Sequence, residues 1–372
     1  MECIRCGNRD FKYFYLDKDV YYCRKCIQFG RINVGEKIPI QTYMCKKHRV
    51  HPKLTFELTN KQKEVSNQVL QNALNEKNTL VYACCGAGKT EIVYEVITKF
   101  LNDGKKVGFA IPRRQVVLEI QDRLKKVFPT LKVIAVCEGN TDVVDGDLIV
   151  CTMHQLHRYH QTFDLLIMDE IDAFPYKNNP VLESIASHAC KGVKVYLTAT
   201  PSNQLIKSDI EVVELFQRPH GHPLIVPTFI QLPIFLQYMH MFYTLLKSNE
   251  QWLVFVPTIS LANQLSKLYK NSKAFTSKTE NKEEIIEMFR KHEISVLFTT
   301  TILERGVTFK NIHILVLQSN HIVFDEASLI QIAGRVGRDP NFPYGKAIFY
   351  GNEKTKVIKN CMLSLEKMNE SV

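Results

Sequence analysis

Short apolar runs alternate with amphipathic stretches along most of the chain after residue 53. The first half carries five such runs, at 79–82, 106–112, 148–151, 163–168 and 194–201. Each has the length of a buried strand, whereas 61–74 and 91–97 show apolar residues at helical spacing. Strands that alternate with helices are typical of parallel sheets covered by helices. The pattern therefore predicts an α/β fold.

A second series of elements begins after a boundary rich in proline and glycine, Arg218-Pro219-His220-Gly221-His222-Pro223. Strands are expected at 252–258 and 294–298, and helices at 260–269 and 282–290. The sequence thus predicts four segments. They are a cysteine-rich module with a basic linker at 1–52, a first lobe at 53–217, a linker at 218–228 and a second lobe at 229–372.

Composition agrees with a globular protein and suggests an anionic partner. The chain has 372 residues, of which 45% are hydrophobic and 23% are charged. Its net charge of +10 favours nucleic acid or an anionic membrane surface as a partner. We see neither a signal peptide nor an apolar run of membrane-spanning length, so a cytoplasmic protein is expected. Cytosolic thiols stay reduced, so the 11 cysteines require a role other than disulfides.

Four of those cysteines have the spacing of a metal site. Cys3 and Cys6 form one C-x2-C pair, and Cys23 and Cys26 form a second. Two such pairs close a tetrahedral zinc site whose role is structural, because no coordination position stays open. The segments 11–15 and 20–22 are expected to form a hairpin between them. An alternative ligand pair, Cys45 and His48, stays open.

The stretch Ala83-Cys84-Cys85-Gly86-Ala87-Gly88-Lys89-Thr90 joins a predicted strand to a predicted helix. Glycines allow successive backbone N–H groups to face phosphates at a helix N-terminus. We therefore expect Gly86, Ala87 and Gly88 to bind the nucleotide phosphates. Lys89 should meet the β- and γ-phosphates and the Thr90 hydroxyl should hold Mg²⁺. Ala83 occupies the position at which the usual motif has its first glycine. It is therefore open whether the first turn of this loop is as tight as usual.

Two carboxylates follow the apolar run that ends at Met168. Asp169 is expected to hold Mg²⁺, and Glu170 to orient or deprotonate the attacking water. The strand at 194–201 ends in Thr198-Ala199-Thr200, whose hydroxyls could sense the γ-phosphate. Gln62, near the start of the helix at 61–74, is a candidate for the adenine edge.

Arginines supply the remaining candidates. Arg335 and Arg338 are three residues apart, so a helix would present both on one face, with Gln331 one turn earlier. The second half has no phosphate loop, so these residues are expected to serve the first lobe's nucleotide in trans. Arg113, Arg114 and Thr152 follow predicted parallel strands, where a phosphate backbone could bind.

The phosphate loop, Asp169-Glu170-Ile171-Asp172, Thr198-Ala199-Thr200 and the segment 331–338 occur in the order found in superfamily 2 helicases. The chain resembles such a helicase, which implies two RecA-like lobes. With the four-cysteine module in front, it is similar to the ComFA family of ATP-driven competence proteins of transformable Gram-positive bacteria.

The resemblance implies a cytoplasmic motor, peripheral at the inner membrane face, that helps to pull one strand of incoming DNA through an uptake channel. It implies ATP, Mg²⁺ and Zn²⁺ as cofactors, stimulation by single-stranded DNA and a ComFC-like partner. By motif match, catalysis is expected from Lys89, Asp169, Glu170, Gln331, Arg335 and Arg338. The DNA backbone is expected at Arg113, Thr152, Thr300 and Arg305.

Three alternatives stay open. A PriA-like replication or repair helicase also joins zinc to such a motor, but its cysteines lie between the motor motifs. An RNA-remodelling ATPase would use the same lobes. A non-catalytic DNA-binding adaptor would not need intact Lys89, Asp169 and Glu170. The sequence leaves oligomeric state, polarity of movement, duplex unwinding and docking on a membrane channel open.

Overall fold

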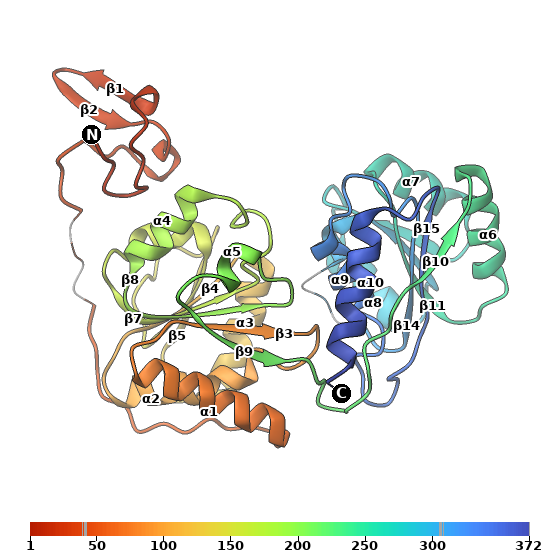
Figure 1. The fold of residues 1–372 in the computed structure, drawn as a ribbon, viewed down its shortest axis with the longest axis horizontal. Helices are drawn as coiled ribbons and strands as arrows, with labels where there is room; N and C mark the ends of the chain where they lie inside the picture. Colours follow the sequence, from red (N-terminus) through yellow and green to blue (C-terminus); the bar gives the residue numbers. More distant parts are fainter. Residues whose placement is uncertain (39, 41–42, 305–306, 308, 372) are drawn as a thin grey trace. The chain divides into compact units, whose positions relative to one another are not determined.

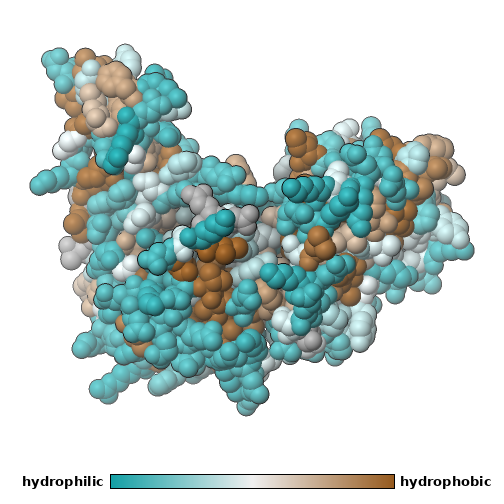
Figure 2. All heavy atoms as spheres, viewed as in Figure 1, coloured by the Kyte–Doolittle hydropathy of each residue, from teal (hydrophilic) through white to brown (hydrophobic). Residues whose placement is uncertain are grey.

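The computed structural model describes residues 1–38, 40, 43–304, 307 and 309–371. Two compact units make up the chain. The first comprises residues 1–83 and 88–215, and the second comprises residues 84–87 and 216–372. The finer boundaries expected at 52, 217 and 228 stay predictions. Figure 2 shows hydrophilic residues over most of the visible surface, with hydrophobic patches between them.

A seven-stranded sheet forms the centre of the first unit (Figure 1), in the order β5-β6-β4-β7-β8-β3-β9. Its strands are β3 (Thr79–Ala83), β4 (Val107–Ile111), β5 (Val133–Val136), β6 (Leu148–Thr152), β7 (Phe163–Asp169), β8 (Cys190–Thr198) and β9 (Glu211–Leu215). All neighbours pair in parallel. Every residue of β4 and β6 is buried, as expected for strands covered on both faces. The runs predicted as strands are confirmed, while β5 and β9 were not predicted.

The helices of this unit are α1 (Asn60–Leu74), α2 (Tyr94–Asn102), α3 (Arg114–Val127), α4 (Pro180–Ala189) and α5 (Asn203–Ile206). Thr59 caps α1 through a capping box, in which the Gln62 side chain accepts from the Thr59 amide at 3.0 Å. The helix predicted at 91–97 was wrong at its start. A 3₁₀ turn, η3 (Glu91–Val93), precedes α2 there.

The amino-terminal module is a hairpin of β1 (Phe14–Asp17) and β2 (Val20–Cys23) between two 3₁₀ turns, η1 (Phe11–Tyr13) and η2 (Ile27–Phe29). The strand predicted at 11–15 was wrong in its first residues, because the Asp10 side chain accepts from the Lys12 amide and starts η1. Lys18 and Asp19 both have positive φ, at 46° and 65°. Two such residues form the turn that suits the twist of a two-residue hairpin.

The second unit contains a six-stranded parallel sheet in the order β10-β15-β14-β11-β13-β12. Its strands are β10 (Thr228–Gln231), β11 (Gln251–Phe255), β12 (Ser272–Phe275), β13 (Val296–Thr299), β14 (Ile312–Val316) and β15 (Ala347–Gly351). Its helices are α6 (Ile234–Leu246), α7 (Ile259–Leu268), α8 (Lys282–Arg290), α9 (Glu326–Ala333) and α10 (Lys356–Asn369). No helix among the described residues is long and apolar enough to cross a membrane.

A close backbone approach occurs where β7 and β8 shift register between Phe163 and Leu165. A Cβ atom at Gly192 would lie 2.1 Å from the Asp164 carbonyl oxygen. Because that neighbour is backbone, it cannot rotate away. Gly192→Ala should therefore destabilise the first unit by about 1–3 kcal/mol, seen as a lower melting temperature.

Lys191→Ala is the control for this change, because its side chain is exposed on the same strand and forms only a surface ion pair with Asp164 at 3.4 Å. Its expected cost is at most about 1 kcal/mol. Equal melting temperatures for the two variants would contradict the steric argument.

Candidate nucleotide and metal sites

The candidate nucleotide site lies where the carboxyl ends of the strands meet in the first sheet. β3, which leads into the phosphate loop, and β7, which ends at Asp169, both flank β8. Parallel strands end at the same edge, so the loops after these three strands are neighbours. The topology thus brings the phosphate loop, the carboxylates and the threonines after β8 together.

The phosphate loop leaves β3 at Ala83, which is fully buried as the last strand residue. Positive φ occurs only further on, at 85° for Gly86 and 86° for Gly88. The missing first glycine is therefore compatible with the loop, because the described backbone needs no left-handed residue at Ala83. The amides of Glu91 and Ile92 donate to the Gly88 carbonyl, which starts η3 directly behind the loop.

Gln62 reaches this loop from α1. It is 2% exposed, and a Cβ atom at Gly88 would lie only 2.4 Å from its Nε2 atom. Only glycine leaves room for this approach. The capping box holds the other side-chain atom, Oε1, so the amide is fixed against the loop.

Asp169 and Glu170 stand at the end of β7. Burial raises the pKa of Asp169 to about 6, with Lys89 lowering it and Glu170 raising it. The Glu170 amide donates to the Asp169 side chain at 2.8 Å and to the Leu197 carbonyl at 3.0 Å. Glu170 has φ of 53°, which is uncommon for a residue other than glycine. The strand end thus holds two adjacent carboxylates in a fixed backbone turn.

Asp172 was not among the candidate site residues, yet it joins two motifs. Its carboxylate accepts from the Thr198 hydroxyl at 2.7 Å and from the Thr200 hydroxyl at 2.6 Å. Asp172 and Thr198 are both buried. A rearrangement at either hydroxyl would therefore be transmitted to the segment that carries Asp169 and Glu170. The repeated carboxylate in Asp169-Glu170-Ile171-Asp172 was the only available signal.

The predicted nucleic-acid residues of the first unit lie at the same sheet edge. Arg113 precedes α3 directly after β4, and Thr152 is the last residue of β6. Arg114 is exposed, and its Nε atom donates to the Glu138 carbonyl at 2.7 Å. Thr152 is 8% exposed. Directly after Thr152 the chain forms a 3₁₀ turn, η4 (Met153–Arg158).

In the second unit, the prediction that Arg335 and Arg338 lie on one helix was wrong. Helix α9 ends at Ala333, so Arg335 and Arg338 lie in the turns beyond it. Gly337 has φ of 67°, a left-handed conformation that stops a helix. Gln331 remains on α9, where its side chain accepts from the Cys85 thiol at 3.0 Å. Arg335 is buried and donates to the Val307 carbonyl.

Thr300 follows β13 directly and is half-buried. Arg305, expected to contact the nucleic-acid backbone, lies outside the described residues.

One arginine, at the start of the predicted linker, organises these turns. Arg218 is 1% exposed and donates to the carbonyls of Gly334 at 2.8 Å, Val336 at 2.8 Å and Gly337 at 2.7 Å. Its Nε atom donates to the Cys85 carbonyl at 3.0 Å, also in the second unit. Burial lowers the pKa of Arg218 to about 10. A single guanidinium therefore satisfies four carbonyls of irregular backbone, a role that no sequence pattern indicated.

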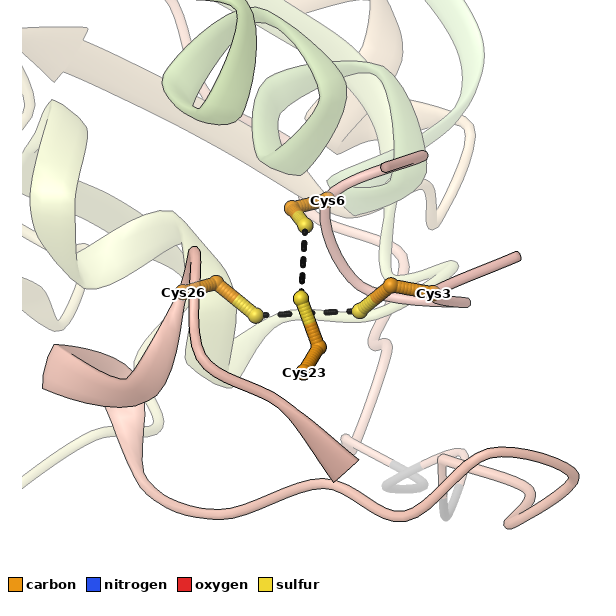
Figure 3. Close-up of side chains that lie close together, drawn as sticks. All are labelled: Cys3, Cys6, Cys23 and Cys26. Carbon is orange, nitrogen blue, oxygen red and sulfur yellow. Dashed lines mark hydrogen bonds between the residues drawn. The ribbon is translucent and has the colours of Figure 1, made fainter. Parts of the chain in front are cut away.

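The four cysteines of the module converge on one point (Figure 3). Their sulfur atoms all lie within 4.8 Å of one another, and the Cys3–Cys26 and Cys6–Cys23 pairs are each 3.7 Å apart. A tetrahedral zinc site with Zn–S bonds near 2.3 Å has sulfur–sulfur edges of about 3.8 Å. The residues therefore fit zinc.

Neighbouring thiols of the cluster affect one another's pKa values. A hydrogen bond from Cys26 lowers the pKa of the Cys3 thiol, while that bond raises the pKa of Cys26. Without a cation, one thiolate is stabilised at the expense of the others. Four thiolates together require a bound metal ion.

The alternative pair does not join this cluster. Cys45 is exposed, and His48 pairs with Asp147 at 3.3 Å between Nε2 and Oδ1. Among the described residues, the four-cysteine cluster is the group of ligands with metal-binding geometry.

Comparison with known proteins agrees with this geometry. Residues 55–203 match the family model for the type III restriction enzyme res subunit, and residues 236–340 match the helicase conserved C-terminal domain. The competence protein ComFA of Streptococcus pneumoniae is 36% identical over 99% of this chain and 90% of its own length. This chain belongs to the ComFA family.

Other relatives extend this relationship. ComFA of Bacillus subtilis is 32% identical over 99% of this chain and 85% of its own length. A RecG ATP-dependent DNA helicase of Streptococcus pneumoniae is 24% identical over 83% of this chain and 50% of its own length. As a ComFA-family protein with both helicase domains, the chain is an ATP-hydrolysing superfamily 2 helicase.

Solved helicase structures share the fold. S. cerevisiae Dbp5 bound to RNA and ADP BeF3 superimposes with a TM-score of 0.62 at 16% identity, covering 85% of this chain and 92% of that one. Mycobacterium smegmatis Lhr bound to single-stranded DNA and AMP-PNP gives a TM-score of 0.59 at 14% identity, covering 84% of this chain and 50% of that one. The expected pair of RecA-like lobes is confirmed.

Cys23→Ser tests the metal centre. Cys23 is 1% exposed, and losing one thiolate leaves an incomplete site whose binding free energy no longer supports the module. We expect zinc content measured on the purified protein to fall from about one ion per chain to well below that, with a lower melting temperature. Cys45→Ser is the matched control and should retain its zinc. A folded Cys23→Ser protein with a full complement of zinc would contradict this ligand set.

Proposed function

We propose that this ComFA-family protein is an ATP-driven translocase on single-stranded DNA that acts in the uptake of transforming DNA. One observation carries the proposal. A phosphate loop and two adjacent carboxylates lie at one sheet edge in a chain that matches ComFA proteins over 99% of its length.

The phosphate loop and the carboxylates after β7 would bind the nucleotide. The amides of Gly86–Thr90 would hold the phosphates, with Lys89 against the β- and γ-phosphates. The Thr90 hydroxyl and the Asp169 carboxylate would hold Mg²⁺, which neutralises phosphate charge when bound. Glu170 would orient the attacking water. Gln62, fixed beside Gly88, would contact the adenine edge.

The second unit would complete the reaction. Gln331, Arg335 and Arg338 match the helicase motif that stabilises charge on the transferred phosphoryl group. In our proposal Arg218 acts on catalysis indirectly, because it holds the carbonyls of the turn that carries both arginines. ATP binding and release would then alternate the strength of the two units' grips on DNA.

Backbone contacts would hold the DNA strand without reading its sequence. Arg113, Arg114 and Thr152 in the first unit and Thr300 and Arg305 in the second are the proposed contacts. The net charge of +10 supports an anionic partner. A ComFC-like partner, a place at the inner face of the cell membrane and docking on an uptake channel complete the proposal.

Glu170→Gln tests the chemical role. The amide keeps the size of the side chain but cannot act as a base, so ATP should still bind while hydrolysis falls about 100-fold or more. Nucleotide affinity and steady-state hydrolysis measure the two effects separately. Glu119→Gln, an exposed position on α3, should leave the rate within twofold of the unchanged protein. Full turnover by Glu170→Gln would remove this residue from the mechanism.

The substrate is tested by steady-state ATP hydrolysis with no nucleic acid, single-stranded DNA, duplex DNA or RNA at fixed salt and nucleotide concentration. We expect single-stranded DNA to give the strongest stimulation. Equal or greater stimulation by RNA would overturn the DNA assignment and favour an RNA-remodelling ATPase. No hydrolysis under any condition would favour an adaptor.

A further inference from the structure

The module's hairpin carries two tyrosines on the face that lies opposite its buried cysteine, and one of them is exposed. Phe14 and Cys23 pair across the hairpin and are buried, at 7% and 1% exposure. The next pair along, Tyr15 and Tyr22, points to the opposite face, because side chains alternate along a strand. Tyr15 is 51% exposed. The two rings also contact each other edge to face, with 5.6 Å between their centroids, and Tyr22 is half-buried, so the pair contributes to the hairpin as well.

Cations lie beside these rings. The Arg31 guanidinium is 4.5 Å from the Tyr22 ring centroid, and that of Arg24 is 5.7 Å from the Tyr15 centroid. At the end of the hairpin the Arg24 amide donates to the Tyr13 carbonyl at 2.7 Å.

The Lys25 ammonium lies 5.2 Å from the Tyr13 centroid. We call Tyr13, Tyr15, Tyr22, Arg24, Lys25 and Arg31 the tyrosine face.

We infer that the tyrosine face is a binding surface for single-stranded DNA, separate from the motor motifs. Flat aromatic rings stack on unpaired bases of any sequence, and adjacent cations neutralise the phosphates between them. A duplex hides its base faces in its own stack, so it cannot use such rings. Our choice of DNA rests on the proposed function.

The charges favour a phosphate partner over a protein surface. Arg31 also pairs with Asp17, but Arg24 is exposed and forms no ion pair with any carboxylate in the described ranges. Covering an uncompensated guanidinium with protein costs desolvation energy, whereas a phosphate supplies the opposite charge.

The module also packs beside a proposed DNA contact. The Phe29 ring at its end lies 6.1 Å from His154 and 5.1 Å from His157, both on η4. This turn follows Thr152, one of the proposed backbone contacts. The cysteines and Phe14 belong to the same buried cluster as Met153 and Leu156. Because Phe14 faces this cluster, the tyrosine face lies on the other side of the hairpin from η4.

The test is nucleotide-free binding of fluorescent oligo-dT to the full chain at fixed salt, measured by anisotropy. Tyr15→Ala/Tyr22→Ala should raise Kd by about tenfold for each stacked ring lost. Tyr15→Phe/Tyr22→Phe should bind as the unchanged protein does, because stacking needs the ring and not the hydroxyl. Zinc content and basal ATP hydrolysis should not change.

Tyr243→Ala is the matched control. Tyr243 is 55% exposed on α6 and lies under Lys247 at 4.5 Å from the ring centroid, yet it belongs to the other unit. Its loss should leave the Kd unchanged. An equal loss of affinity in this control would overturn the inference.

An unchanged Kd for oligo-dT in a zinc-loaded Tyr15→Ala/Tyr22→Ala protein would overturn the inference. It would also be overturned if this variant bound oligo-U more weakly but oligo-dT as tightly as the unchanged protein does. If the Tyr15→Ala/Tyr22→Ala variant loses its zinc, Arg24→Gln tests the inference instead. It should reduce the dependence of log K on log salt by about 0.7, and an unchanged slope would overturn the inference. Failure of the proposed function is separate, because it would appear as absent stimulation of the unchanged protein's ATP hydrolysis by single-stranded DNA.

Discussion

The nucleotide site depends on a carboxylate that the sheet buries. Asp169 ends a strand whose apolar residues are almost entirely buried, so its charged form is disfavoured unless a cation compensates it. Lys89 provides part of that compensation, and Mg²⁺ would provide the rest. A site of this kind is poised for a cationic ligand, because binding relieves the cost of burying the charge. The same argument explains why the phosphate loop and the carboxylates must end at one sheet edge.

Hydrogen bonds also join the segment that follows this carboxylate to the neighbouring strand. The hydroxyls of Thr198, at the end of β8, and of Thr200 donate to the two oxygens of Asp172, three residues beyond Asp169. Such a buried and fully bonded arrangement has few alternative geometries, so a change at the nucleotide would be passed on as a discrete shift. In the second unit Arg218 plays a comparable part. Its guanidinium holds carbonyls that a regular helix would otherwise have satisfied.

The amino-terminal module follows a different physical rule. A segment of fewer than 40 residues cannot bury enough apolar surface to be stable alone, and a metal site commonly supplies the difference. Here the cysteines also share a buried cluster with residues of the first unit. Metal binding and docking onto that unit would thus stabilise the module together, while Tyr15 stays exposed on its hairpin.

Local sequence determined much of this protein. Buried strands appeared as apolar runs, the phosphate loop as glycines between strand and helix, and the metal centre as two C-x2-C pairs. Each of these signals arises within a few residues, where backbone and ligand geometry are fixed by chain connectivity. The capping box of α1 is local in the same sense, because Thr59 and Gln62 meet within one turn.

Only the tertiary structure decided the remaining features. The partners of Asp172 and Arg218 come from distant segments, so no local pattern could indicate them. Helical spacing predicted Arg335 and Arg338 on one helix face, but the left-handed Gly337 and the carbonyls held by Arg218 form turns there instead. Strand β5 has only four residues, and β9 is interrupted by exposed glutamates, so neither forms a clear apolar run; which strands they pair with depends on the sheet order. Tyr15 and Tyr22 became distinguishable from core residues only once β1 and β2 were in register, because register decides which face each side chain occupies.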